Sequence, residues 1–334
     1  MNGVDDALGG DLRTVLELAA LAPSVHNTQP WHFHWDGASL LVREDRSRGL
    51  PVLDPDGRER VLSCGAAILN ARVALAELGH DHTVRLLPDP GQPDLLAVLE
   101  IAGRVEPGEE VRALARAIPR RTTDRDPFDA RAVPEPARTA LRLAAEQEGA
   151  WLRFIDDDAD DAVELQVLLS HADDSQRNDP RYLAELAAWR RDREAEGVPS
   201  RALPSVPAEL RASTWVPRDF DAGSAGGAVA AGDPQDPPPA EHPTVFVFGT
   251  PGDDRQNWLL AGQALGRLLL RATVDGLAAQ PLTQVLEVPV LRARMRHVLG
   301  VQGHPQMLMR VGYGHAGPSS RRRAVEDYAS SGTG

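Results

Sequence analysis

Two apolar runs of equal length, 197 positions apart, constrain the fold of this 334-residue chain more than any other feature. Leu62–Gly79 and Leu259–Gly276 align without a gap and place Gly65 opposite Gly262. Both runs are apolar around most of the helix, which is typical of a buried helix rather than a surface one. Each ends in glycine, where a helix commonly turns left-handed. We therefore expect two buried helices in two copies of one unit; chance similarity between helical segments is the alternative.

Similar elements flank each of the two runs. A helix, a loop and a Trp-led strand come before it, and a buried strand comes after it. In chain order these segments are the helical run Leu12–Leu21, the strand Trp31–Trp35, the strand Leu95–Ile101, the helix-to-strand segment Leu141–Ile155 and the strand Met307–Gly314. The pattern predicts an α+β fold of two repeats, 10–118 and 119–325.

The second unit carries a long insertion between its strand and its buried helix. Phe33 lies 32 positions before Gly65, whereas Phe154 lies 108 positions before Gly262. Part of the insertion has helical patterns, over Asp160–Ala172 and Pro180–Glu196.

The rest of the insertion, 197–243, is rich in Pro, Gly and Ala, a composition that predicts a loop. A loop of this length in a compact fold is usually a linker or a functional lid. The apolar residues Trp215, Val216 and Phe220 favour a lid, because a linker has no need of them. A passive insertion is the alternative.

Ala22–Trp31, with the sequence APSVHNTQPW, separates the first helical run from the first strand. Its Ser, His, Asn and Gln side chains stand on backbone that no helix or strand uses. Such a cluster suits contact with a flat, polar-edged ligand. Pro23 and Pro30 are equally consistent with an ordinary connecting loop, so the residues alone leave both interpretations open.

Two arginine clusters are candidates for binding an anion. In Ile118–Phe128, with the sequence IPRRTTDRDPF, three arginines flank two threonine hydroxyls, a set that suits a phosphate monoester. A solvated basic turn is the alternative. The second cluster, Arg321–Arg323, follows a strand and a Gly-Pro turn near the C-terminus, where a solvated tail is the default expectation.

These motifs resemble those of the nitroreductase superfamily. The first loop matches the flavin-contacting pattern PSxxNxQPWxF, and its longer form with His26 and Thr28 is most similar to the Acg family of FMN-binding relatives. The second segment resembles the phosphate-binding motif RxSxR/K, with Thr123 in place of Ser. Arg322 and Arg323 best match a closing basic pair, although Arg321 and Ala324 stand where prolines are usual. That departure leaves the register of the pair open by one residue.

The resemblance implies an FMN site made by both repeats. The loop AAQPLTQ, Ala278–Gln284, would present donors to the flavin ring. The implied FMN-binding residues are Pro23, Ser24, Val25, Asn27, Gln29, Arg121, Thr122, Thr123, Arg125, Pro281, Thr283, Gln284, Arg322 and Arg323.

The resemblance also implies a single site in a nitroreductase-like fold. Ordinary family members are intertwined homodimers, and Acg-like proteins resemble such a dimer fused into one chain. The first repeat holds the flavin-lining loop and the second holds the phosphate clamp. No RxSxR motif precedes Leu12, and AAEQEGA (Ala144–Ala150) stands where a second lining loop would be. We therefore expect a pseudo-dimer that is a monomer, with one FMN per chain and a vestigial second pocket.

The implied activity is that of an FMN-dependent oxidoreductase, which passes electrons from NAD(P)H to a small acceptor of the nitroaromatic or quinone type. The flavin supplies the reaction, so no catalytic acid or base is expected among the side chains. The alternative is a catalytically silent protein that stores or sequesters FMN under the lid. A regulatory or interaction protein without flavin is a third interpretation.

Other chemistry has weaker support. His26, His32 and His34 have no carboxylate or thiolate at ligand spacing, so no metal is expected. Cys64 is the single cysteine, which excludes an intrachain disulfide, and no lysine is present to form a Schiff base. No GxGxxG follows a strand, which disfavours a Rossmann dinucleotide site.

Charge and hydropathy indicate the expected compartment and partners. The net charge of −13 argues against nucleic-acid or membrane-surface binding. No apolar run approaches the ~20 residues of a membrane helix, and the N-terminal residues do not resemble a secretory signal. A cytoplasmic location is the resulting expectation.

Overall fold

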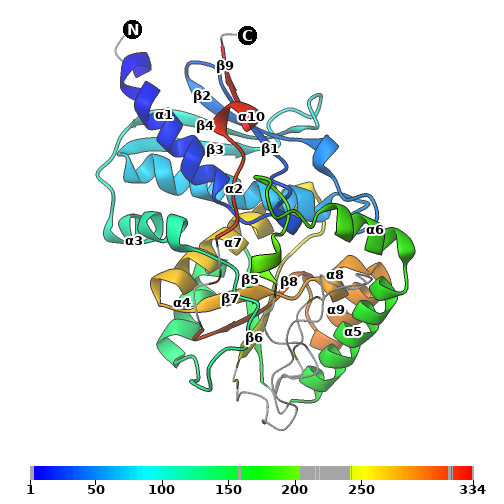
Figure 1. Ribbon diagram of the computed structural model, residues 1–334. Coiled ribbons are helices and arrows are strands. Elements are labelled where there is room, and N and C mark those ends of the chain that lie inside the picture. Colours follow the sequence, from blue (N-terminus) through cyan, green and yellow to red (C-terminus); the bar gives the residue numbers. More distant parts are fainter. Residues whose placement is uncertain are drawn as a thin grey trace.

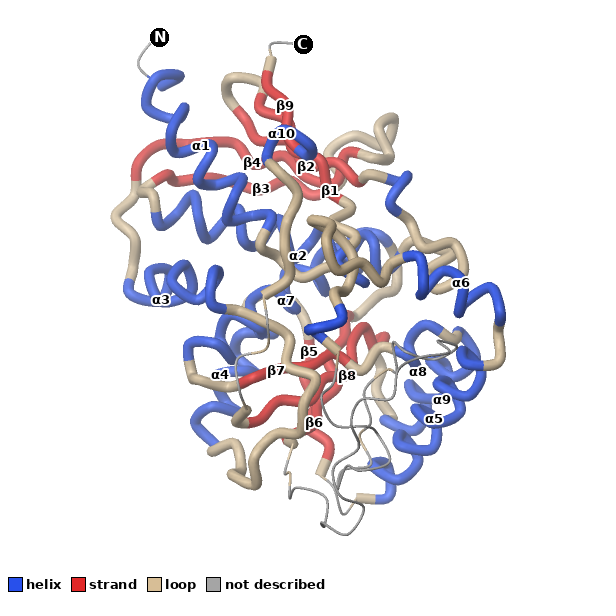
Figure 2. The backbone as a smooth tube through the Cα atoms, in the orientation of Figure 1, coloured by secondary structure: helices blue, strands red, loops and turns tan. Residues whose placement is uncertain are grey.

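The chain forms two sheet-containing layers that meet across a pair of long helices, as a computed structural model shows (Figure 1). The structure describes residues 4–156, 159–203, 215, 218, 241, 243–314, 317 and 319–332. Figure 2 shows the strands gathered in two groups, with the helices α2 and α7 between them.

The first sheet has five strands in the order β3-β4-β2-β1-β9. Its antiparallel strands come from the first part of the chain, whereas β9 comes from the last and pairs with β1 in parallel, Phe33 opposite Ala329. The strands are β1 (Trp31–Trp35), β2 (Ser39–Glu44), β3 (His80–Leu86), β4 (Leu95–Arg104) and β9 (Ala329–Ser331).

The second sheet has four antiparallel strands in the order β5-β6-β8-β7. Its two central strands are buried along nearly their whole length; most of their residues are apolar, and the buried Gln306 and Arg310 of β8 are hydrogen-bonded. The strands are β5 (Trp151–Ile155), β6 (Thr244–Thr250), β7 (Ala278–Pro281) and β8 (His304–Gly312).

The two predicted buried helices are α2 (Arg58–Glu77) and α7 (Arg255–Val274), and they cross at Gly65 and Gly262. A β-carbon added to Gly262 would lie 2.8 Å from the Cα of Gly65 and would overlap the carbonyl oxygen of Leu62. Only glycine permits this approach of one backbone to the other. The contact holds the two layers together at the centre of the molecule.

The remaining helices surround this centre. The three helices α5, α8 and α9 pack on one another beside the second sheet (Figure 1). The helices are α1 (Val4–Ala20), α3 (Glu109–Ala117), α4 (Glu135–Glu146), α5 (Asp160–Arg177), α6 (Pro180–Ala188), α8 (Gln284–Glu287), α9 (Pro289–Leu299) and α10 (Val325–Tyr328). Short 3-10 turns are η1 (Val25–Asn27), η2 (Arg46–Arg48), η3 (Ile118–Arg120) and η4 (Ser200–Ala202).

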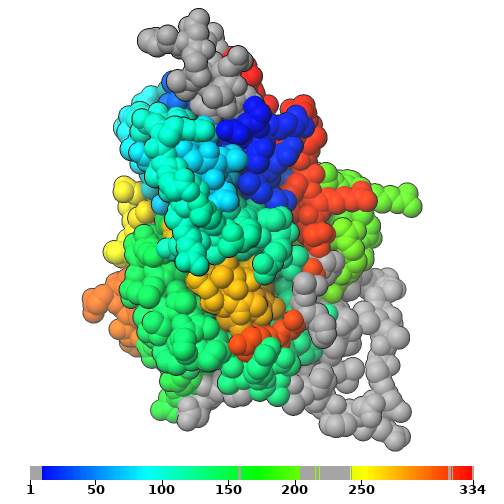
Figure 3. Space-filling model, turned by 90° about the vertical axis from the view of Figure 1, so that its left-hand side faces the viewer, coloured from blue at the N-terminus to red at the C-terminus, as the bar shows by residue number. Residues whose placement is uncertain are grey.

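The C-terminal segment crosses from the second layer back to the first. In Figure 3 it runs, in red, down the molecule beside α1. The Arg13 guanidinium donates to the Glu326 carboxylate at 3.0 Å, and the Tyr328 hydroxyl donates to the Leu16 carbonyl at 3.3 Å. These contacts seat the segment on α1 before it adds β9 to the sheet.

The α+β class, the strand Trp31–Trp35 and both buried helices are confirmed. Gly79 and Gly276 follow the buried helices with φ of 80° and 71°, as their left-handed ends require.

One predicted helix is wrong. A helix is predicted over Pro180–Glu196, but α6 ends at Ala188. The chain turns back after it, and the Val198 N–H donates to the Trp189 carbonyl. The residues between carry no apolar face that could extend the helix, and Gly197, with φ of 78°, makes the turn.

The predicted lid, 197–243, lies mostly outside the described residues, as do Val216 and Phe220. Trp215 is described and is 2% exposed, packed in the core of the second layer. None of the helices that the structure describes is long and apolar enough to cross a membrane.

The crossing of α2 and α7 at Gly65 and Gly262 leads to a prediction about stability. Gly262→Ala would force two backbones apart, so we expect it to lower the free energy of unfolding by about 1–3 kcal/mol, the usual cost of overpacking. Gly103→Ala is the matched control, because a β-carbon there meets nothing within 4 Å. Urea denaturation of both variants measures the difference; equal stabilities would contradict the crossing.

Candidate functional site

The loop after α1 has a strained backbone. His26, Asn27 and Gln29 have φ of 45°, 54° and 50°, although none is glycine. Among the described residues only Leu87 shares this feature. Non-glycine residues with positive φ persist where surrounding contacts over-determine them, and they cluster at binding sites.

Side-chain hydrogen bonds hold the strained loop in place. The Ser24 Oγ accepts the Gln29 N–H at 3.0 Å, and the Gln29 Nε2 donates to the Ala195 carbonyl at 2.7 Å. The Asn27 Nδ2 donates to the Gly197 carbonyl at 3.1 Å. The loop is therefore fixed by the segment that follows α6, more than 160 residues away in sequence.

A cavity, here called the inner cavity, lies beneath this loop and between the two layers. One wall is α2 and the loop after α1, and the opposite wall is β7 and the start of α8. Apolar side chains from α2, α7 and β8 complete it. Its lining is Pro23, Ser24, Val25, His26, Glu59, Leu62, Ser63, Thr123, Arg125, Arg218, Leu265, Gln280, Pro281, Thr283, Gln284 and Met307.

A second cavity, here called the arginine cavity, adjoins the inner cavity. Both are lined by Pro23, Ser24, His26, Thr123 and Arg125. The remaining lining of the arginine cavity is Leu21, Asn27, Ile118, Pro119, Arg121, Thr122, Val198, Ser319, Ser320 and Arg322. Together the two cavities offer a basic, hydroxyl-rich end and a largely apolar end.

Arg121 is the most informative side chain of the arginine cavity. Its Nε and Nη1 are buried and have no hydrogen-bond partner in the part of the chain that the structure describes. Burial alone lowers the pKa of Arg121 to about 10. A buried donor without a partner costs about 1–3 kcal/mol, and more when it is charged. An anion bound here would satisfy this guanidinium.

Arg125 and Arg322 add positive charge beside Arg121. Burial, followed by repulsion from Arg218 and Arg121, lowers the pKa of Arg125 to about 10. Burial and repulsion from Arg121 lower the pKa of Arg322 to about 9. The Arg322 guanidinium donates to the carbonyls that end α1, among them Ala22 at 3.0 Å. Arg121 thus destabilises the charged forms of both neighbours, and an anion among the three guanidiniums would relieve that repulsion.

A buried ion pair anchors the arginine-bearing segment 121–128 to the second sheet. The Arg310 Nη1 donates to the Glu241 carboxylate at 3.0 Å, and its Nη2 donates to the Asp126 carbonyl at 2.8 Å. The Glu241 carboxylate also accepts the Phe128 N–H at 3.1 Å. Arg310 is therefore a positioning residue that fixes the segment carrying Thr123 and Arg125.

One residue of the insertion reaches the inner cavity. Arg218 is 7% exposed and pairs with the Glu287 carboxylate at 2.5 and 2.6 Å. It also donates to the Thr283 hydroxyl at 3.1 Å and to the Tyr182 hydroxyl. The cluster fixes α8 against α6 and puts a guanidinium on the cavity wall.

Twelve of the residues predicted from the resemblance line the two cavities, and Gln29 and Arg323 do not. Gln29 is fully buried behind the loop. The Arg323 guanidinium donates to the carbonyls of Gln29 and Trp31 at 2.7 and 3.2 Å, so it supports the loop from behind. Of the C-terminal arginines, Arg322 is the one in the lining.

The sequence analysis did not single out several lining residues. Glu59 and Ser63 lie in the first two turns of α2; Ser63 belongs to the predicted run Leu62–Gly79, whereas Glu59 precedes it and gave no signal. No sequence pattern pointed to Arg218, because its ion-pair partner, Glu287, is 69 positions away in the chain. His32 and His34 both contact the Ser330 hydroxyl, at 3.0 and 2.9 Å. No metal-binding group of three or more His, Cys, Asp or Glu occurs among the residues the structure covers.

Comparisons with known proteins give consistent matches. A sequence model described as the Nitroreductase family matches residues 118–313, more than half of the chain. A Mycobacterium tuberculosis H37Rv protein named "Putative NAD(P)H nitroreductase Rv3131" is 39% identical over 307 residues, 90% of this chain and 85% of that protein. "Putative NAD(P)H nitroreductase acg" of the same strain is 30% identical over 321 residues, 95% and 94% of the two chains. A solved nitroreductase with bound FMN from Bacteroides fragilis NCTC 9343 is 15% identical and covers 63% of this chain and 93% of its own, with a TM-score of 0.36.

The unsatisfied guanidinium leads to a binding prediction. Arg121→Ala should weaken FMN binding by about 1.5–3 kcal/mol, the scale of a lost hydrogen bond to a charged group. Arg120→Ala is the control, since Arg120 is exposed and lines neither cavity. Fluorescence titration of the flavin-free protein with FMN measures both affinities; equal losses in the two variants would refute the assignment.

Proposed function

Because this chain belongs to the nitroreductase family, and within it to the Acg group, we propose that it is an FMN-binding oxidoreductase that passes electrons from NAD(P)H to a small acceptor of the nitroaromatic or quinone type. Two of its relatives are named as NAD(P)H nitroreductases. The observation that carries the proposal is the buried guanidinium of Arg121, whose Nε and Nη1 lack a partner among the described residues, at the basic end of two adjoining cavities.

The residues present fit FMN. The phosphate monoester would take the arginine cavity, where Arg121, Arg125 and Arg322 supply charge-assisted donors. The flavin ring would take the inner cavity, between the loop after α1 and the β7–α8 turn. Leu62, Leu265 and Met307 supply apolar contact from three different elements, as a flat ring requires.

When bound, FMN would supply the redox chemistry, taking a hydride from NAD(P)H and giving electrons to the acceptor. The protein contributes position and electrostatics. Arg125 and Arg218 put positive charge on the wall of the inner cavity, which favours negative charge on a reduced ring. The Thr283 hydroxyl and the turn after β7, which line the inner cavity, would orient the polar edge of the ring.

We propose that the chain is a fused pseudo-dimer of two repeats, 10–118 and 119–325, with one FMN. Support comes from α2 and α7, two helices of 20 residues that cross at Gly65 and Gly262 and end in left-handed glycines. Each helix follows an antiparallel strand pair of its own layer. A fused interface already buries the surfaces that two subunits would share, so we expect a monomer.

Contacts from the insertion support a second candidate function, FMN storage without turnover. Arg218 lies on the wall of the inner cavity and is held by a buried ion pair. Ala195 and Gly197 hold the loop after α1 from outside. If the insertion, including the segment 197–243, acts as a lid, it would exclude nicotinamide from the ring and leave the flavin bound but silent.

Anaerobic mixing separates the two functions. We expect rapid loss of the visible flavin absorbance when the FMN-loaded protein meets excess NADH or NADPH, since an open ring accepts hydride directly. Reduction by dithionite but by neither nucleotide would instead support storage. The same preparation should contain one FMN per chain; two would contradict the single site.

A further inference from the structure

Glu59 stands between two cavities. It is the second residue of α2 and is 4% exposed. It lines the inner cavity and also a third cavity, here called the side cavity, on the outer side of α8 and α9. The side cavity is lined by Leu53, Asp54, Pro55, Asp56, Arg58, Glu59, Asp253, Trp258, Leu286, Glu287, Pro289, Arg292, Ala293, Arg296, His304 and Pro305.

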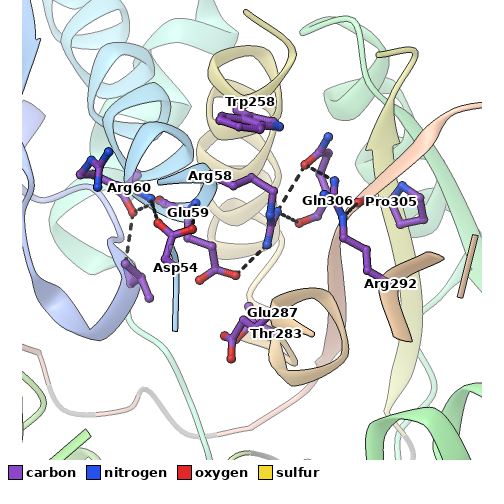
Figure 4. Close-up of polar contacts among 12 residues, drawn as sticks. Asp54, Arg58, Glu59, Arg60, Trp258, Thr283, Glu287, Arg292, Pro305 and Gln306 are labelled. Carbon is purple, nitrogen blue, oxygen red and sulfur yellow. Dashed lines mark hydrogen bonds and ion pairs between the residues drawn. The ribbon is translucent and has the colours of Figure 1, made fainter. Parts of the chain in front are cut away.

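The carboxyl group of Glu59 has one firm partner. The Arg58 Nη2 donates to its Oε1 at 2.8 Å, while the Arg58 Nη1 donates to the Gln306 carbonyl at 2.9 Å. Figure 4 shows the Glu59 carboxyl directed toward Arg58, with Glu287 on its other side. Arg58 also donates to Gln306, and the nearby Arg218 is paired with Glu287. Neither cation is therefore devoted to the Glu59 carboxyl group.

Charges on every neighbouring element act on Glu59. Burial is the largest effect and raises the pKa of Glu59, and repulsion from Glu287 on α8 and from Asp54 before α2 raises it further. Attraction to Arg58 and Arg218 opposes it, and Arg292 on α9 also interacts with the Glu59 charge. The balance raises the pKa of Glu59 to about 8, so the carboxyl keeps its proton at neutral pH.

His26 is the other side chain in the described lining of the inner cavity whose ordinary pKa would allow it to donate a proton near neutral pH. Burial and repulsion from Arg218 lower the pKa of His26 to about 3. The imidazole is therefore neutral at pH 7 and does not donate as an imidazolium. Glu59 is the carboxyl in the described lining of the inner cavity.

We propose that Glu59 is the proton donor to the acceptor, an inference that rests on the proposed oxidoreductase function. A quinone that takes a hydride, with its two electrons, at one oxygen needs one proton at the other to become the hydroquinone. The Glu59 carboxyl O–H bond breaks, the acceptor O–H bond forms, and Glu59 is left as a carboxylate. A proton from the solvent, reaching Glu59 through the side cavity, then restores the carboxyl group, so that the quinone has gained one hydride and one proton in all.

Glu59→Gln tests the donor in the anaerobically reduced protein. A quinone needs the proton, whereas ferricyanide takes single electrons and needs none. We expect the variant to lower the rate with quinone at least ~100-fold, the lower range for a lost general acid, and to leave the ferricyanide rate unchanged. Glu77→Gln, on the same helix and outside both cavity linings, is the control. Equal loss with both acceptors, or no loss with quinone, would overturn the proposal.

The pH profile of the wild-type protein gives an independent test. The donor must be protonated, so the quinone rate should be constant below the pKa of Glu59 and fall as pH rises through about 8. The ferricyanide rate should not follow this fall, and the residual quinone rate of Glu59→Gln should be flat. This test does not depend on the folding of the variant: a wild-type quinone rate that stays constant as pH rises through about 8 overturns the proposal.

Infrared difference spectra of the flavin-free protein give a readout that does not depend on turnover. The wild type should show a protonated-carboxyl C=O band at pH 7 that disappears as pH rises through about 8, and Glu59→Gln should lack it. Absence of the band in the wild type contradicts the donor. Other results would contradict the proposed function and not the role of Glu59: the protein binds no FMN, or its flavin, once mixed with NAD(P)H, reduces neither acceptor.

Discussion

The close crossing of α2 and α7 determines where everything else in the molecule can lie. Two helices meeting through Gly65 and Gly262 bring their backbones within van der Waals contact, closer than any side chain allows. Each helix carries one sheet, so the crossing sets the distance between the layers. The inner cavity lies beside it and has walls from both helices. A wider separation would leave a groove open to water in place of a narrow slot for a flat ring.

The basic end of the site stores unfavourable electrostatic energy in the protein without ligand. Arg121, Arg125 and Arg322 are desolvated, and the repulsion among them lowers the pKa of Arg125 and Arg322 further. Arg121 differs from the other two, because its Nε and Nη1 have no partner among the described residues, whereas Arg125 and Arg322 donate to backbone carbonyls. Burying a donor without a partner is costly. Arg310 and Glu241 show the contrasting case: both side chains are fully buried and form an ion pair with each other, and their role is to hold the segment 121–128. The same residue type is therefore proposed for binding in one place and belongs to the architecture in another.

Local sequence predicted the features that depend on neighbouring residues. Hydrophobic periodicity located both buried helices and the first strand, and glycine marked their ends. Arg121, Arg125 and Arg322 line one cavity, although roughly 200 residues separate the first two from the third. Arg218 and the segment after Ala188 could not be predicted, because their structure depends on partners elsewhere in the chain. The helix predicted to Glu196 ends at Ala188 for local reasons, because the residues after it have no apolar face and Gly197 makes a turn that returns Val198 to Trp189.

The parallel strand β9 has a consequence for the order of folding. Residues 319–331 supply Arg322 to the arginine cavity and the last strand to the first sheet, next to β1. These pairings join segments about 300 positions apart, and loop closure over such a distance is slow. Until the segment that carries β9 has been synthesised and has docked, the β1 edge of the first sheet stays uncovered. An uncovered edge strand is a template for pairing with other chains. The same segment supplies Arg322, so its docking covers this sheet edge and adds the third arginine to the arginine cavity in one step.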